Sequence, residues 1–202
     1  MTATRRSVAL AGHTGDVDGA RLGLASTDPE VRAAALGALE RLGVLGDDDV
    51  SGALADDSAT VRRRAATIAA VHPGVDMLAA LSDRDAAVVE VTAWACGERE
   101  AVSDPVLARL VELATLASAD PLVRESSVAA LGAIGDDRGL DAILTATTDK
   151  PAIRRRAVLA LAPFLDPDHG RAGDVAAALE RALTDRDWQV RQAAEDLTPT
   201  DD

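Results

Sequence analysis

Large aromatic side chains are nearly absent from this 202-residue chain, which has one Phe, two Trp and no Tyr. Its apolar residues are mainly Ala, Leu and Val, whose small side chains let helices pack at the short end of the range of about 8–10 Å between axes. Ala and Leu are strong helix formers, so this composition favours an all-α core made of many shallow contacts. No apolar run approaches the length of a membrane span, and no membrane association is expected.

Cysteine is limited to Cys96, and lysine is limited to Lys150. A single cysteine excludes an intramolecular disulfide and favours a reducing, cytoplasmic location. Cys96 takes an apolar helical position without a neighbouring His or basic cluster, so we expect an inert core thiol. The net charge of −13 repels phosphate backbones and argues against nucleic acid as a partner.

Residues that hold metals or cofactors are also scarce. His13, His72 and His169 lie far apart in the sequence, with no HExxH motif and no paired cysteines. The chain has no Gly-rich phosphate loop, and Asp47-Asp48-Asp49 lacks the alternating ligands of a calcium loop. The sequence therefore predicts no metal, no cofactor and no catalytic residues, which argues against an enzyme.

The chain does contain a nine-residue phrase that occurs six times, at intervals of 27 to 37 residues. Repetition at this period is typical of a solenoid, in which each unit buries its apolar face against its neighbours. The six copies are LASTDPEVR from Leu24, LADDSATVR from Leu54, LSDRDAAVV from Leu81, LASADPLVR from Leu116, ATTDKPAIR from Ala146 and LTDRDWQVR from Leu183.

Each phrase opens a helix. Its fifth residue is a good N-cap in five of the six copies, and Pro follows it in three, at the first helical position. Apolar residues then recur at helical spacing, and Gly43 and Gly135 are plausible helix ends. A shorter amphipathic segment precedes each phrase, which predicts a helix–turn–helix unit. The fifth residues are Asp28, Ser58, Asp85, Asp120, Lys150 and Asp187.

These units resemble HEAT repeats, specifically the phycobilisome-lyase HEAT-like type. Ala130-Leu131-Gly132 matches the continuation of that motif, and Trp94–Glu98 matches a common variant with Cys in place of Leu. The resemblance implies a right-handed α-solenoid of about six HEAT-like helical hairpins plus an N-terminal half-repeat. It leaves activity open, because scaffolds, chromophore lyases and regulators share the fold.

The repeat pattern runs from end to end, so we expect a single HEAT-like domain over residues 1–202. Thr4–Val8 aligns with Arg154–Val158, which predicts that residues 2–13 form a capping half-repeat. Residues 16–197 then hold six helix–turn–helix units, and 198–202 form a frayed tail.

An arginine ends the phrase in five of the six copies, and the third copy has Val89 instead. The resemblance implies that this arginine pairs with an acidic residue in the turn, forming a ladder along the solenoid. When the two are compared within each repeat, the pair is complete only in repeats two and six, and Asp83 lacks a partner. The arginines are Arg32, Arg62, Arg124, Arg154 and Arg191.

The two residues after that arginine fall outside the apolar phase of the helix, so they pattern the exposed face with charge. Such a pattern could set the register of a bound protein. The alternative is a solvated face whose charges pair with nearby acids and contribute about 0–1 kcal/mol each. The candidate partner-binding residues are Arg63, Arg64, Glu90, Glu125, Arg155 and Arg156.

Trp94 and Trp188 could anchor an interface, but we expect structural roles instead. Trp94 sits where the family often has Trp and should pack between helices, and Trp188 should shield the end of the stack.

The leading hypothesis is a non-enzymatic, monomeric protein–protein interaction scaffold or adaptor that presents a concave helical surface. A second hypothesis is a bilin-lyase-like or other ligand-chaperone activity in the groove, which rests on the resemblance alone. A third is a HEAT-like DNA glycosylase, which the acidic, aromatic-poor chain disfavours.

Overall fold

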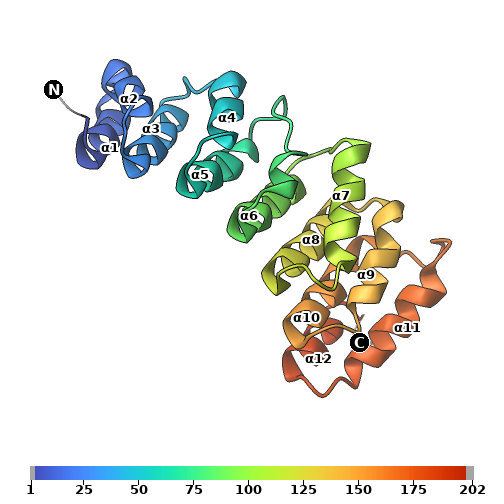
Figure 1. The fold of residues 1–202 in the computed structure, drawn as a ribbon. Coiled ribbons are helices and arrows are strands. Elements are labelled where there is room, and N and C mark those ends of the chain that lie inside the picture. Colours follow the sequence, from blue (N-terminus) through green and yellow to red (C-terminus); the bar gives the residue numbers. More distant parts are fainter. Residues whose placement is uncertain (1–2, 199–202) are drawn as a thin grey trace. The chain divides into compact units, whose positions relative to one another are not determined.

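The computed structural model describes residues 3–198, which form twelve α-helices and three short 3-10 helices without a strand (Figure 1). The predicted all-α repeat fold is confirmed. The chain divides into two compact units, Met1–Ala95 and Cys96–Asp202, and the division falls within α6 (Ala86–Gly97). No helix in the described part of the chain is long and apolar enough to cross a bilayer.

The first unit has two layers of helices (Figure 1). The second helix of each repeat packs on the second helix of the next, and the first helices cover one side of this row. The first member of the row is the N-terminal helix of the described residues, where the sequence predicts a half-repeat. The row is α1 (Arg5–Thr14), α3 (Pro29–Arg41) and α5 (Ala59–Ala69), and the covering helices are α2 (Val17–Leu24) and α4 (Asp47–Leu54).

The second unit repeats this arrangement with three complete hairpins (Figure 1). Its second helices are α8 (Pro121–Ile134), α10 (Pro151–Ala160) and α12 (Trp188–Glu195). Its first helices are α7 (Asp104–Thr115), α9 (Leu140–Ala146) and α11 (Ala172–Leu183). Short 3-10 helices lie before α9 at Asp137–Gly139 and after α10 at Ala162–Phe164.

The second helices begin where the phrase predicts. The carboxylates of Asp28, Asp120 and Asp187 each accept a hydrogen bond from a backbone N–H of the first turn. Ser58 and Lys150 occupy the same position without a side-chain cap. At the other end, Gly43 and Gly135 have positive φ, which an L side chain rarely adopts, so both predicted helix ends are confirmed.

The third repeat departs from the expected helix–turn–helix unit. Only a 3-10 turn, Ala80–Ser82, stands between α5 and α6, where the pattern predicts a first α-helix. The interval between phrases is shortest here, and His72-Pro73-Gly74 follows α5 after Ala70 and Val71. Pro lacks the N–H that a helix interior needs, and Gly is a poor helix former, so a helix cannot continue through this segment.

The core is built from small side chains, as the composition predicts. The only aromatic ring among the fully buried residues is that of Phe164. The small side chains let the helices pack closely. A Cβ at Gly132 of α8 would lie 2.6 Å from the Cα of Ala160 in α10. The expected capping half-repeat and frayed tail lie partly outside the described residues, at residue 2 and at residues 199–202.

Candidate protein-binding surface

The arginine that ends each phrase is a structural residue. Arg62 is 5% exposed, and its Nε and Nη2 atoms donate to the two carboxylate oxygens of Asp83 at 2.7 and 2.9 Å. Its Nη1 atom donates to the backbone carbonyls of Asp56 and Asp57 at 2.8 and 3.0 Å. The guanidinium therefore connects the turn of its own repeat to the turn of the following one.

The pairing register differs from the expected one. Each arginine bonds the turn carboxylate of the next repeat, so Asp83 has a partner and the ladder is not confined to repeats two and six. The prediction that each arginine pairs within its own repeat was wrong. The second helix of a repeat packs against the next repeat, so its arginine reaches the turn carboxylate there. The pairs are Arg32–Asp56, Arg62–Asp83, Arg124–Asp149 and Arg154–Asp185.

The same carboxylates also fix the turns. Asp56, Asp83 and Asp185 each accept a hydrogen bond from the backbone N–H two residues later, at 2.8 Å. The arginine hydrogen bonds hold the pKa of Asp56 and Asp185 below the ordinary range. At Asp83, burial raises the pKa, but the hydrogen bond from Arg62 outweighs it and the pKa is lowered.

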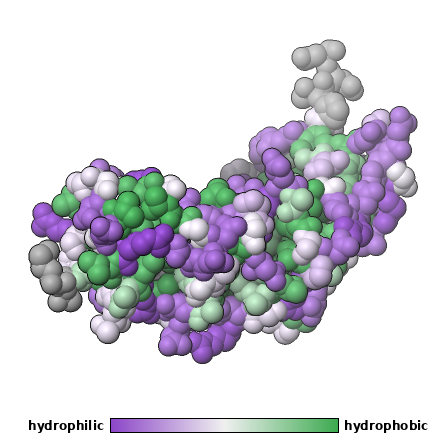
Figure 2. Space-filling model, turned by 90° about the horizontal axis from the view of Figure 1, so that it is seen from above, coloured by the Kyte–Doolittle hydropathy of each residue, from purple (hydrophilic) through white to green (hydrophobic). Residues whose placement is uncertain are grey.

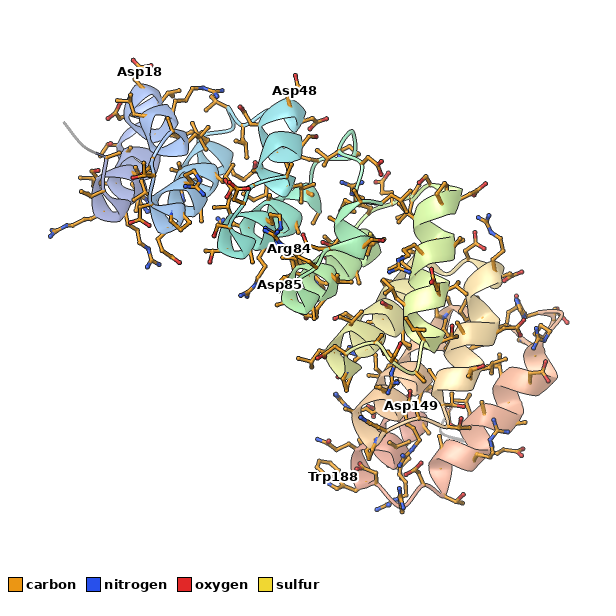
Figure 3. The ribbon with its side chains drawn as sticks, in the orientation of Figure 1. Asp18, Asp48, Arg84, Asp85, Asp149 and Trp188 are labelled. Atoms are coloured by element: carbon orange, nitrogen blue, oxygen red, sulfur yellow. The ribbon has the colours of Figure 1, made fainter. Side chains whose placement is uncertain are left out.

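Arg124 is the imperfect member of the ladder. Thr148 stands where the other turns have Asp, and Asp149 is one residue too late to accept both nitrogens. A single bond remains, from Nη2 to Oδ1 of Asp149 at 3.0 Å, and Nε is buried without a partner among the described residues. Figure 3 shows Asp149 in the turn between α9 and α10.

The candidate partner-binding residues lie directly after these arginines on the second helices. Arg63 of α5 is exposed and Arg64 is half-buried, and on α10 Arg155 is half-buried. Within residues 3–198, none of these three side chains has a hydrogen bond or an ion pair, in contrast to the ladder arginines beside them. Their charge is therefore not consumed by the fold.

The acidic candidates differ from one another. Glu125 of α8 and Arg156 of α10 lie 3.7 Å apart between carboxylate and Nε, with exposed side-chain fractions of 23% and 39%. This contact joins two of the predicted residues across neighbouring repeats. Glu90, on α6, is half-buried. Arg63, Arg64 and Glu90 thus belong to the first unit, and Glu125, Arg155 and Arg156 to the second.

Both tryptophans are more exposed than expected. Trp94 is 42% exposed because Ala93, Ala95 and Cys96 take the buried positions of α6. Trp188 is 65% exposed at the start of α12 (Figure 3), so it does not shield a core. Helical phase alone would have placed Trp94 outside the apolar stripe.

The predicted inert thiol is confirmed. Cys96 is buried, and burial raises its pKa to about 12. Among the described residues, no group of three or more His, Cys, Asp or Glu side chains could hold a metal ion.

Two surface features had no signal in the sequence. In the second unit, a pocket of about 560 Å³ is lined mainly by apolar side chains of α11 and its neighbours, including Phe164, Leu179 and Leu197. In the first unit, a groove of about 330 Å³ lies on the exposed face of α1, α3 and α5. Figure 2 shows that apolar and hydrophilic residues are interspersed on the face in view.

The family described as HEAT repeats matches residues 75–162. This stretch covers the third, fourth and fifth repeats. No curated protein matches the sequence significantly.

The solved structures that share the fold include an engineered protein and a human enzyme. The engineered protein is 20% identical with a TM-score of 0.62, covering 96% of this chain and 60% of its own. Human deoxyhypusine hydroxylase in complex with glycerol is 18% identical with a TM-score of 0.51, covering 79% of this chain and 67% of its own. The chain thus spans about three fifths of the engineered protein. At these identities, the likeness establishes the fold alone.

Proposed function

We propose that this chain is a non-enzymatic scaffold or adaptor that binds another protein through the exposed faces of its second helices. The observation that carries the proposal is the contrast between neighbouring arginines. Arg62 and Arg154 are fully occupied by the ladder, whereas Arg63 and Arg155, one residue later, have no partner among the described residues. Unpaired guanidiniums on the exposed faces of helices are suited to the carboxylates of a protein ligand.

The phycobilisome-lyase HEAT-like resemblance, the monomeric state and a cytoplasmic location belong to the same proposal. The buried, unreactive thiol of Cys96 is compatible with a reducing compartment. The net charge of −13 disfavours nucleic acid as the partner.

The test is affinity capture of a partner from the source cells at low salt. We expect the wild-type chain to retain a defined protein, and the double variant Arg63→Glu/Arg155→Glu to lose it. Arg181→Glu is the matched control, because this exposed arginine lies on α11, in the other layer of helices. Equal capture by wild type and double variant contradicts the proposal.

A second candidate is the holding of a small molecule, such as a bilin chromophore, in the pocket of the second unit. Its support is the volume of about 560 Å³ and a mainly apolar lining, in which Glu180 is the only charged side chain among the residues that the structure describes. The test is to produce the protein in cells that also make the chromophore and to measure the visible absorbance of the purified protein. Retained colour that Leu179→Glu abolishes supports this candidate, and a colourless wild-type protein contradicts it.

A further inference from the structure

The groove on the first unit collects positive charge in an otherwise acidic protein. Its rim carries three guanidinium groups, from Arg5 of α1, Arg41 of α3 and Arg64 of α5. Glu30 is the one acidic side chain in the lining, and it lies 3.7 Å from Arg5 in an exposed pair. The groove is therefore cationic, although the whole chain has a net charge of −13.

Small residues make room for these groups. A Cβ built at Gly37 of α3 would lie 3.0 Å from the Cζ atom of Arg64, so the guanidinium lies over this glycine. A Cβ at Gly12 of α1 would lie 2.9 Å from Nη1 of Arg41. Ala33 and Ala34 of α3 also line the groove.

Two of the three guanidiniums have no partner within residues 3–198. Arg41 and Arg64 make neither a hydrogen bond nor an ion pair there, and the Arg5–Glu30 pair is long and solvent-exposed. Each guanidinium presents five donors in a planar fork that matches a carboxylate. The groove thus has free guanidinium N–H donors at its rim, and its glycine and alanine lining lets a ligand approach the helix backbone closely.

We propose that this groove binds an extended acidic peptide segment of a partner protein, a proposal that rests on the scaffold function above and names its ligand class. The guanidiniums come from three successive helices, whose axes are about 8–10 Å apart. An extended ligand can therefore reach more of them at once than a single small anion can. Alternate side chains of an extended peptide are about 6–7 Å apart on one face, so its carboxylates can meet successive flexible arginines.

Nucleic acid fits the groove less well than an acidic peptide. No aromatic side chain lines it, so bases would have no surface on which to stack. The acidic remainder of the chain also repels a long phosphate backbone more than it repels a short peptide.

The test uses the full chain and a fluorescein-labelled octapeptide of alternating Glu and Ala, with binding followed by anisotropy at low ionic strength. We expect binding to this peptide and none to the matched Lys–Ala peptide. The variant Arg41→Ala/Arg64→Ala should bind about tenfold more weakly or worse, because each charge-assisted hydrogen bond contributes on the order of a tenfold factor.

The matched control is Arg6→Ala/Arg181→Ala, which removes the same charge from exposed positions outside the groove and should change affinity little. Gly37→Ala is a second variant, which keeps every charge. The three atoms nearest to its new Cβ all belong to the flexible Arg64 side chain. This variant should weaken binding while the chain stays folded.

The acidic-peptide assignment is overturned if both double variants weaken binding equally or if the Lys–Ala peptide binds as well. It is also overturned if oligothymidylate displaces the Glu–Ala peptide more effectively than unlabelled peptide does. Partner capture that depends on Arg63 and Arg155 but not on Arg41 and Arg64 overturns this site alone and leaves the scaffold proposal standing.

Discussion

Two adjacent arginines, in α5 and again in α10, have opposite roles, although sequence composition treats them alike. Arg62 is buried and bonded to two turns, while Arg63 points into solvent. Removing one member of a buried pair leaves an unpaired charge, which costs several kcal/mol, whereas removing an exposed charge costs little. The position within the helical turn decides which arginine stabilises the fold.

Arg62→Ala should lower the free energy of unfolding by about 3 kcal/mol, because Asp83 is then buried without its partner. Arg63→Ala is the control and should change the free energy of unfolding by no more than about 0.5 kcal/mol. Urea unfolding followed by circular dichroism measures both. Similar losses for the two variants would contradict the structural assignment of the ladder.

Thr148→Asp should stabilise the second unit by about 1 kcal/mol, because it supplies the carboxylate that the buried Nε of Arg124 lacks. Ser118→Asp is the matched control: it changes the corresponding turn, but the preceding repeat has Val89 in place of arginine. Unfolding midpoints should rise for the first variant only. A gain at both positions would indicate a general turn effect.

His72 predicts a pH dependence of stability. Its ring lies 2.8 Å from Asp47 through Nδ1 and 2.8 Å from Glu40 through Nε2. Burial lowers the pKa of His72, but hydrogen bonds to these carboxylates outweigh it and raise the pKa above its ordinary value of 6.5. A raised pKa stabilises the fold fully below about pH 6.5, and this stabilisation is lost as the pH rises through the folded-state pKa.

The unfolding free energies of wild type and His72→Gln, compared from pH 6 to pH 9, isolate this contribution from the other histidines. The difference between them should shrink as the pH rises. A difference in unfolding free energy that is constant or grows with pH would contradict a stabilising contact between protonated His72 and the two carboxylates.

At the scale of the helix, packing distance depends on which residues are small. Gly132→Ala should destabilise the second unit by about 1–3 kcal/mol, because the new Cβ meets the backbone of Ala160 and forces α8 away from α10. Gly173→Ala, in α11, meets no atom within 4 Å and should be neutral or stabilising by up to about 1 kcal/mol. Thermal unfolding of both variants tests this, and equal effects would contradict it.

The helices were largely predictable from sequence, because cap, Pro and apolar spacing are local signals. Contacts between repeats were not. The phrase predicts Arg62 and Asp83 as ladder residues, but their pairing depends on the offset between neighbouring repeats, which no local pattern encodes. The missing helix before α6 could have been inferred from Pro73 and the short interval.

The candidate surface was predictable only in part. Helical phase correctly placed Arg63 on the exposed face, since it follows the buried Val61 and Arg62. The contribution of Arg41 to the groove was missed, because it comes from the far end of α3 and reaches Gly12 of another helix. Such a convergence arises only when helices from separate repeats are brought together.

At the scale of the whole molecule, the account separates residues that hold the repeats together from residues that are free to bind a partner. Arg155 tests this separation most directly. It follows the buried ladder residue Arg154 and is itself without a partner among residues 3–198. Reversing its charge should affect recognition and leave folding unchanged.

The decisive measurement is the dissociation constant of the captured partner for wild type and Arg155→Glu, determined by calorimetry alongside the unfolding midpoint of each chain. The account predicts that affinity falls about tenfold or more, because an attraction between opposite charges becomes a repulsion, while the midpoint is unchanged. An unchanged dissociation constant would contradict this account. Weaker binding accompanied by loss of folding would also contradict it.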